Sequence, residues 1–270
     1  MQLSVTSWSF PACSLAESVA ISGALGIGAL DLGYFYRPAL DKAALLADPE
    51  SMARKVLELA IPVPCFYHLF GATIAERNLA DAASLDRNAS EFRSVIRFCR
   101  AARIPTVFVL PGVTNPGQEK REALANSARA LSTLVQLAQA DGLTLTIEPH
   151  VHSYLDSPDL VLELLQAVPG LRLTLDYAHF ICMGFTQPQI DVLAPHAAHI
   201  HLRQARPGYL QTKLDQGVID FSAMLGLLSS QGYDRALAIE YVHQAYMNTL
   251  YDDVLTETIA MRDLVRAWME

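Results

Sequence analysis

Four short apolar segments of this chain each end on a carboxylate or an imidazole, and no other feature restricts its fold as much. The segments are TLTIEPH with Glu148, LTLDYAH with Asp176, HIHLR with His201 and LAIEYVH with Glu240. Each is typical of a β-strand of apolar or branched residues that meets a loop at a polar group. In a (β/α)8 barrel the carboxyl ends of all the strands converge on one pocket. The pattern therefore predicts such a barrel, with these four side chains gathered at its mouth.

Strand-like and helix-like patterns alternate eight times along the chain. The strand-like runs are short and rich in Val, Ile, Leu or Thr, as expected for parallel strands covered on both faces. A doubly wound open sheet would show the same alternation, but no GxGxxG or P-loop opens a first strand–helix turn. The predicted fold class is therefore α/β, a (β/α)8 TIM barrel, with strands at Leu3–Ser7, Ile27–Leu32, Pro62–His68, Thr106–Leu110, Leu143–Glu148, Arg172–Asp176, His199–Leu202 and Ala236–Glu240.

Helices are predicted most clearly in the second half of the chain. Glu119–Ala140 carries apolar residues at a spacing of three and four and stops before an Asp-Gly pair. Asp252–Met269 has a similar pattern and would form the last helix of the barrel. Ser157-Pro158 reads as an N-cap followed by proline at the first helical position. The helical patterns are weakest over residues 41–60 and 70–88.

Composition indicates a single enzyme domain over residues 1–270. The chain is 51% hydrophobic and 18% charged, without a Pro/Gly/Ser-rich linker, and barrels of roughly 250 residues fold as one domain. A net charge of −8 argues against a nucleic-acid partner. The opening residues lack the pattern of a signal peptide, and no apolar run reaches the ~20 residues of a membrane span. Together with four scattered cysteines, these features predict a cytoplasmic protein.

The four strand-end residues form a ligand set for a divalent cation. Glu148, Asp176, His201 and Glu240 are donors suited to Mn²⁺, Mg²⁺, Co²⁺ or Zn²⁺, with Mn²⁺ as the preferred assignment. Three carboxylates would repel one another in a pocket of low dielectric constant, and a cation removes that conflict. The alternative is that each residue lies on the surface or pairs with an arginine across the mouth.

Five further histidines lie near the predicted strand ends. His179 follows Asp176 by three residues, and in a short helix it would face the mouth as a substrate ligand or proton donor. His199 shares a face with the metal-binding histidine and lies one layer deeper, as a hydrogen-bonded core residue. His68 ends the third strand and is a candidate pocket residue. His150 and His152 either reach the substrate or face solvent.

Arginine and aromatic side chains provide further candidate contacts to a substrate. Arg203 and Arg206 are predicted to hold a hydroxyl, carboxylate or phosphate, unless they form surface ion pairs. Trp8, just after the first strand, is expected to cover a sugar ring or to pack in the core. The loop after the last strand, residues 241–248, has no glycine, whereas barrels that bind phosphate often use glycine-bearing loops there. This favours an unphosphorylated substrate.

The motifs IEPH, LDYAH, HIHLR and AIEY, in this order and spacing, resemble the xylose isomerase-like TIM barrels of the sugar phosphate isomerase/epimerase group. The resemblance runs over the whole chain, is most specific from Glu148 to Glu240, and includes the segment Pro207–Phe221. It implies that the four strand-end residues bind one divalent metal and that His179 contacts substrate. The family contains ketose 3-epimerases, hydroxypyruvate isomerase, dehydratases and the endonuclease IV group. Dimers and tetramers are frequent in it, so a homo-oligomer is compatible with the resemblance, although no local feature specifies an interface.

The chain departs from the endonuclease members of this family. A trinuclear zinc site needs further His and Asp ligands, but the fourth strand runs into Leu110-Pro111 without a histidine. The residues Leu214–Gly217 contain no Asp-x-His. Cleavage of DNA is therefore not expected.

The expected activity is isomerisation or epimerisation of a sugar or keto-polyol. A metal-held carbonyl and hydroxyl would acidify the adjacent C–H, and Glu148 and Glu240 would remove and return the proton through a metal-stabilised enediolate. A dehydratase, in which His179 helps a hydroxyl to leave, is the main alternative. An aldolase- or hydrolase-like enzyme and a non-catalytic sugar-binding barrel are the rival classes, the last disfavoured because binding alone does not require two opposed bases.

Overall fold

The computed structural model describes residues 1–243, 249 and 253–270; residues 244–248 and 250–252, in the loop after the last strand, lie outside the described part. Eight strands pair in parallel in the order β2-β1-β8-β7-β6-β5-β4-β3. Their bounds are β1 Gln2–Thr6, β2 Leu30–Asp31, β3 Cys65–Tyr67, β4 Thr106–Val109, β5 Thr144–Ile147, β6 Arg172–Asp176, β7 Ala197–Leu202 and β8 Ala236–Ile239.

The two ends of this sheet meet and close it. Leu32, just after β2, pairs with Phe66 of β3 in a parallel bridge. The amide of Leu32 donates to the carbonyl of Cys65 (3.2 Å), and the amide of Tyr67 donates to the carbonyl of Leu32 (2.8 Å). Closure satisfies the edges that an open sheet would leave unpaired. The predicted (β/α)8 barrel is confirmed.

Some strands differ in length from the sequence prediction. The third strand begins at Cys65 instead of Pro62, because Pro62 and Pro64 have no amide proton to donate to a neighbouring strand. The second strand is reduced to Leu30–Asp31, and the seventh begins two residues earlier than expected, at Ala197. The carboxyl ends, which carry the candidate ligands, fall within one residue of the predicted positions.

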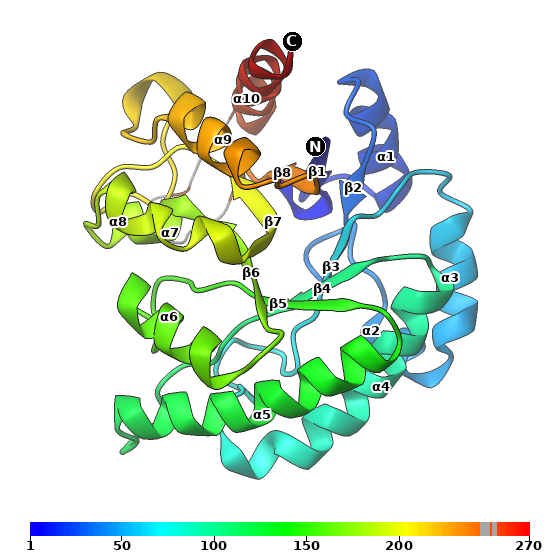
Figure 1. Cartoon of the computed structure of the whole chain (residues 1–270). Helices are drawn as coiled ribbons and strands as arrows, with labels where there is room; N and C mark the ends of the chain where they lie inside the picture. Colours follow the sequence, from blue (N-terminus) through cyan, green and yellow to red (C-terminus); the bar gives the residue numbers. More distant parts are fainter. Residues whose placement is uncertain (244–248, 250–252) are drawn as a thin grey trace.

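Helices surround the barrel, with α4 and α5 side by side along its outside (Figure 1). The predicted helix at residues 119–140 is found as α5, and Gly142 follows it with a φ of +74°, a backbone conformation that favours glycine. The predicted last helix is α10, whose expected first residue, Asp252, lies outside the described part. The helices are α1 Leu15–Ala24, α2 Lys42–Ala47, α3 Pro49–Leu57, α4 Leu85–Ala101, α5 Lys120–Ala140, α6 Pro158–Ala167, α7 Tyr177–Cys182, α8 Gln187–Asp191, α9 Phe221–Ser230 and α10 Val254–Met269, with short 3-10 turns at η1 Ser7–Ser9, η2 Ala82–Ser84, η3 Ala194–His196 and η4 Leu214–Gln216.

N-terminal capping residues explain two helix boundaries. The sequence predicted the first of them clearly and the second only weakly. The Ser157 side chain accepts a hydrogen bond from the Leu160 amide (3.3 Å) at the start of α6, as its Ser-Pro pair predicts. The poorly patterned region 41–60 is divided into α2 and α3 at Asp48, whose carboxylate accepts from the Ser51 amide (3.0 Å) while proline occupies the first turn of α3. One residue thus ends one helix and caps the next.

The barrel interior carries a polar layer directly beneath the mouth. Because strand residues alternate in direction, the side chain two positions before a mouth residue also points inward. Thr146 lies two positions before Glu148 and Thr174 two before Asp176, and their hydroxyl oxygens are 2.8 Å apart. His199 takes the same place below His201. The mouth residues therefore rest on buried hydrogen-bonding groups and not on an apolar floor.

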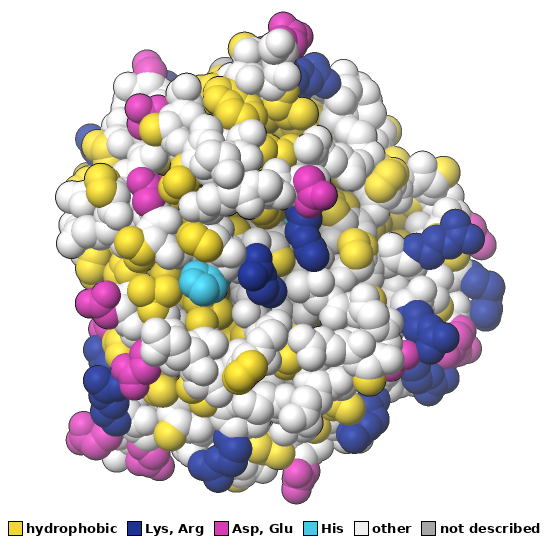
Figure 2. All heavy atoms as spheres, in the orientation of Figure 1, with side chains coloured by type: hydrophobic (Ala, Val, Ile, Leu, Met, Phe, Trp, Pro, Cys, Tyr) yellow, Lys and Arg dark blue, Asp and Glu magenta, His cyan; other side chains and the backbone are white. Residues whose placement is uncertain are grey.

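The outer surface is charged but mixed in sign. Around the rim of the face in Figure 2, basic and acidic side chains are interspersed, in line with ion pairs such as Arg97–Glu50 (2.9 Å) and Arg100–Asp141 (2.8 Å). Such exposed pairs add little to stability. Of the helices in the described part of the chain, none combines the length and the apolar character that crossing a bilayer requires.

Candidate active site

The carboxyl ends of four neighbouring strands bring together four buried donors. Glu148 follows β5, Asp176 ends β6, His201 lies in β7 and Glu240 follows β8. One donor atom from each lies within 4.8 Å of the others. Asp176 is also the N-cap of α7, where its carboxylate accepts a hydrogen bond from the Ala178 amide (2.8 Å). The barrel therefore gathers the four residues that the sequence singled out.

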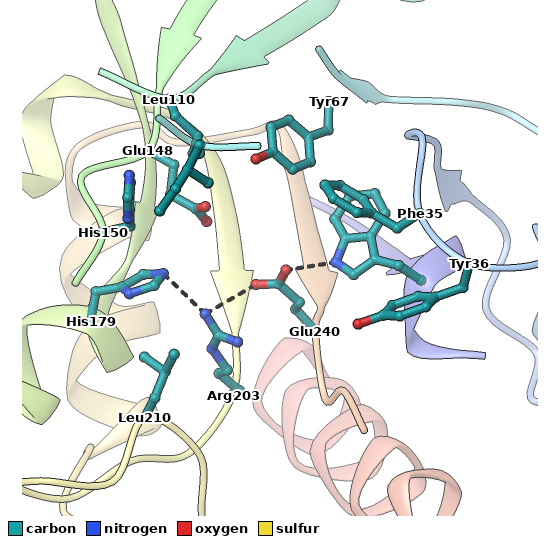
Figure 3. Close-up of a pocket in the computed structure, with 12 residues that line it drawn as sticks. Phe35, Tyr36, Tyr67, Leu110, Glu148, His150, His179, Arg203, Leu210 and Glu240 are labelled. Atoms are coloured by element: carbon teal, nitrogen blue, oxygen red, sulfur yellow. Dashed lines mark hydrogen bonds and ion pairs between the residues drawn. The ribbon is translucent and has the colours of Figure 1, made fainter. Parts of the chain in front are cut away.

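His201 lies between the two glutamates. Its Nδ1 atom is 2.6 Å from Oε1 of Glu148 and 3.1 Å from Oε2 of Glu240. The indole of Trp8 donates from Nε1 to the other oxygen of Glu240 (2.7 Å), which holds that carboxylate in one orientation. Arg203 Nη2 is 2.6 Å from Oδ2 of Asp176 and 3.5 Å from Oε2 of Glu240. Figure 3 shows the carboxylates of Glu148 and Glu240 pointing into the same space.

The charges of this cluster fit a divalent cation. Three carboxylates less one guanidinium leave two negative charges, which a neutral imidazole does not balance. Burial raises the pKa of Glu148 and of Asp176, and the nearby carboxylates of Glu240 and Glu148 overcome burial to raise the pKa of His201 well above its usual value. Oε2 of Glu240 lies within ion-pair distance of His201 and Arg203 but makes no hydrogen bond to a described residue, so this oxygen keeps a lone pair for a cation.

A cavity of about 230 Å³ opens over this cluster. Its size suits a small molecule, since the volume lies below the usual range for drug-sized ligands. Aromatic rings face the carboxylates and histidines across it (Figure 3). The lining residues are Trp8, Phe35, Tyr36, Tyr67, Ile74, Leu110, Glu148, His150, His179, Arg203, Leu210 and Glu240.

The short helix α7 places His179 at this cavity, as its spacing from Asp176 suggested. Its Nδ1 accepts a hydrogen bond from the Val151 amide (3.1 Å). Nε2 lies 3.1 Å from Arg203 Nη2 and 3.7 Å from Oδ2 of Asp176. Burial and the charge of Arg203 lower the pKa of His179 well below its usual value. His179 is therefore a neutral ring at the edge of the cavity, held by the Val151 amide on one side and by Arg203 on the other.

Of the other site residues predicted from the sequence, some line the cavity and some lie outside it. Trp8, Arg203 and His150 line it, whereas His152 is exposed. His68 does not line it; it lies in a smaller pocket next to it, fully buried against α4. Arg206 is exposed, and its guanidinium lies over the ring of Tyr209 (4.1 Å), because the chain turns away from the mouth after β7.

Sequence reasoning missed the aromatic wall opposite the carboxylates. Phe35 and Tyr36 come from the loop after β2, and Tyr67 ends β3. Tyr67 stacks on Phe108 with ring centroids 4.3 Å apart, and Trp8 meets Phe35 edge to face at 5.9 Å. The stretches DLGYFY and CFY follow or end predicted strands and carry the same signal as Trp8, the one aromatic residue that the sequence analysis placed at the pocket.

His68 belongs to a buried ionic cluster that the sequence did not reveal. Its Nε2 atom lies 3.3 Å from Glu91 of α4, which also pairs with Lys42 (2.9 Å) and Arg77 (2.6 Å). Burial lowers the pKa of His68 to about 4, so its ring is neutral near pH 7. Burial alone would raise the pKa of Glu91, but hydrogen bonds from His68 and Lys42 lower it to about 2. Lys42 also donates to the Phe70 carbonyl (2.6 Å), so the cluster fixes the loop that forms one edge of the cavity.

Replacing Glu91 with glutamine should destabilise the protein in a pH-dependent way. The folded-state pKa lies below the usual 4.5, so the folded chain favours the ionised carboxylate. Its contribution, on the order of 3 kcal/mol, is present above pH 4.5 and is lost as the pH falls from 4.5 toward 2. Urea unfolding of the wild type and Glu91→Gln between pH 7 and pH 3 would measure the difference. A stability difference that does not shrink toward pH 3 would contradict this account.

Comparison with known proteins identifies relatives over most of the chain. The model of a family described as xylose isomerase-like TIM barrel matches residues 20–261. Inosose isomerases from Halalkalibacterium halodurans and Bacillus velezensis are each 25% identical to the chain, over 181 and 178 residues or 63% and 62% of its length. The matched region spans 64% of each relative, slightly less than two thirds.

Solved structures share the architecture over nearly the full length. An L-ribulose 3-epimerase superposes with a TM-score of 0.76 at 20% identity, covering 99% of this chain and 94% of the other. The IolI protein with a bound zinc atom gives a TM-score of 0.76 at 17% identity, covering 99% of both. The probable 3-DHS dehydratase AsbF from Bacillus anthracis gives 0.73 at 14%, covering 98% and 99%. At these identities the likeness establishes the fold.

Proposed function

The chain belongs to the xylose isomerase-like TIM barrel family, and we propose that it is a divalent-metal-dependent isomerase or epimerase of a small, unphosphorylated keto-sugar or keto-polyol. The observation that carries the proposal is the convergence of Glu148, Asp176, His201 and Glu240 at the floor of one cavity. Two of these donors, Glu148 and Glu240, also line the cavity itself, where they can reach a substrate. The relatives named inosose isomerase support the same class of reaction.

All four strand-end residues would hold the cation. Three carboxylates and one imidazole suit Mn²⁺, Mg²⁺, Co²⁺ or Zn²⁺, and Mn²⁺ remains our preferred assignment. A bound divalent ion supplies Lewis-acid polarisation of a substrate carbonyl. The Trp8 indole keeps one oxygen of Glu240 occupied, and the Ala178 amide does the same for Asp176, so these two carboxylates are oriented before anything binds.

The two glutamates would move the proton. They come from β5 and β8, on either side of His201, and approach the cavity from different directions (Figure 3). One carboxylate removes the proton from the carbon beside the carbonyl, and the other returns a proton to the opposite face or to the neighbouring carbon. General base and acid steps of this kind each contribute roughly 10²–10⁴-fold. The burial of both groups keeps bulk water from competing for the proton.

The cavity lining indicates what kind of substrate would bind. The aromatic wall offers apolar faces to the C–H side of a sugar or cyclitol ring. On the other side, the neutral ring of His179 and the guanidinium of Arg203 lie side by side, where they can contact a substrate hydroxyl. Arg203 is the one cationic side chain among the described lining residues, and it already pairs with Asp176. A phosphate would therefore find no free cation among them, which supports an unphosphorylated substrate.

Metal binding and hydrogen exchange test the proposal directly. The metal-free protein should bind about one Mn²⁺ or Zn²⁺ per chain by calorimetry. With the ion bound, a panel of ketoses and inososes in D₂O should include a compound that gains deuterium next to its carbonyl, as seen by NMR. Absence of any divalent-ion binding would overturn the proposal. A product that has lost one water would instead identify a dehydratase.

A further inference from the structure

A second group of buried side chains lies beneath the four metal donors and shares His201 with them. The proposed proton transfer does not explain it. It consists of Asp31, His199 and His201, each with a ligand atom within 4.8 Å of the other two. His199 Nε2 is 2.6 Å from Oδ2 of Asp31, and the rings of His199 and His201 meet edge to face with centroids 5.3 Å apart. The prediction that His199 is a hydrogen-bonded core residue is confirmed. Its partner, 168 residues away in the sequence, was not predicted.

Asp31 is an unusual group in this position. It is fully buried at the end of β2, and among the described residues its hydrogen-bonding partner is His199, without a Lys or Arg ion pair. Its second oxygen, Oδ1, makes no hydrogen bond to a described residue. A buried carboxylate with an unsatisfied oxygen costs free energy, so a further ligand for that oxygen is expected.

The nitrogen atom that could bind to this oxygen of Asp31 belongs to His201. Its Nδ1 atom faces Glu148 and Glu240, the side where the cation would bind, and its Nε2 atom is buried without a hydrogen-bond partner among the described residues. If Nδ1 gives its lone pair to a metal, the ring proton must be on Nε2 and needs an acceptor. A histidine that binds a metal through one nitrogen almost always donates its other N–H to a carboxylate, a carbonyl or a water.

We infer that Asp31, held by His199, is a positioning residue that accepts the Nε2 proton of His201, either directly or through one water. This would fix the His201 tautomer and keep Nδ1 aimed at the metal. His199 anchors one oxygen of Asp31 and leaves the other for this contact. His199 also lines a cavity of about 330 Å³ at the amino-terminal end of the barrel. The inference rests on the metal site of the proposed function.

Metal affinity separates this role from a purely structural one. Asp31→Asn keeps the shape of the side chain but removes its charge, and we expect Mn²⁺ or Zn²⁺ affinity measured by calorimetry to fall by roughly 10–100-fold. Glu91→Gln is the matched control, because it removes a buried carboxylate that is ion-paired away from the metal donors. The control should lower the unfolding temperature of the metal-free protein while leaving metal affinity within about twofold.

A second variant keeps the test decisive if Asp31→Asn folds poorly. His199→Gln can still donate to Asp31 through its amide, and it should weaken metal binding less than Asp31→Asn does. In the cobalt-substituted protein, the visible absorption bands should shift in Asp31→Asn and stay unchanged in Glu91→Gln. Wild-type affinity and an unchanged cobalt spectrum in Asp31→Asn, or in His199→Gln where Asp31→Asn does not fold, would overturn the inference alone. A wild-type protein that binds no divalent ion would overturn the proposed function together with it.

Discussion

Replacing Asp176 with asparagine should abolish stoichiometric binding of a divalent cation and lower the isomerisation or epimerisation rate by about 10³-fold or more. Lewis-acid stabilisation by a bound metal is worth several kcal/mol, and each 1.36 kcal/mol changes a rate tenfold. Asparagine can keep the N-cap hydrogen bond to the Ala178 amide through its carbonyl oxygen, so α7 should still form. Asparagine also removes the charge that pairs with the buried Arg203, so the unfolding temperature of the variant would be measured beside its metal content to separate a chemical loss from a failure to fold.

Asp191→Asn provides the matched control for Asp176→Asn. Asp191 lies in α8, next to α7, and accepts a hydrogen bond from the Tyr177 hydroxyl (2.8 Å) away from the cavity. The same chemical change at Asp191 should leave metal content and activity near the wild-type level. Metal per chain would be measured by elemental analysis after dialysis, and activity by D₂O exchange. Retention of a full metal equivalent in Asp176→Asn would place the cation elsewhere.

The mouth of the barrel could be predicted from sequence because topology does most of the positioning. Once eight parallel strands close into a barrel, inward-facing polar residues at the carboxyl ends of neighbouring strands are brought toward the same cavity. Glu148, Asp176, His201 and Glu240 needed no knowledge of side-chain packing to be grouped. Small errors in the strand starts, as at Cys65, do not matter for this purpose, because the site depends on where the strands end.

Residues whose position depends on loops or on distant partners could not be predicted in this way. Arg203 and Arg206 are three residues apart, yet Arg203 is buried against Asp176 while Arg206 is turned outward over Tyr209. Strand alternation fixes the first, whereas the turn after β7 decides the second. The pairing of Asp31 with His199 joins strands that are far apart in sequence, and no local pattern signals it.

Replacing either glutamate with glutamine should stop the interconversion of substrate and product, with a loss of about 10²–10⁴-fold. Glutamine can still offer a carbonyl oxygen to the cation but cannot accept the substrate proton. If the reaction inverts one carbon, Glu148 and Glu240 serve opposite faces of it. Each single variant should then exchange deuterium into one epimer only, and the two variants should show opposite preferences. NMR of each pure epimer in D₂O would reveal this pattern without requiring turnover.

This pattern distinguishes proton transfer from metal binding, which both glutamates also serve. Both variants would be assayed at saturating Mn²⁺, after calorimetry has shown that the ion is bound, so that a weaker metal site is not mistaken for a missing base. Glu163→Gln is the control: this glutamate on α6 pairs with Arg121 on the surface and should exchange both epimers like the wild type. Exchange of both epimers by Glu148→Gln and by Glu240→Gln would exclude these carboxylates as the bases. Loss of all exchange in only one variant would instead assign a single base, as expected for transfer between neighbouring carbons on one face of the substrate.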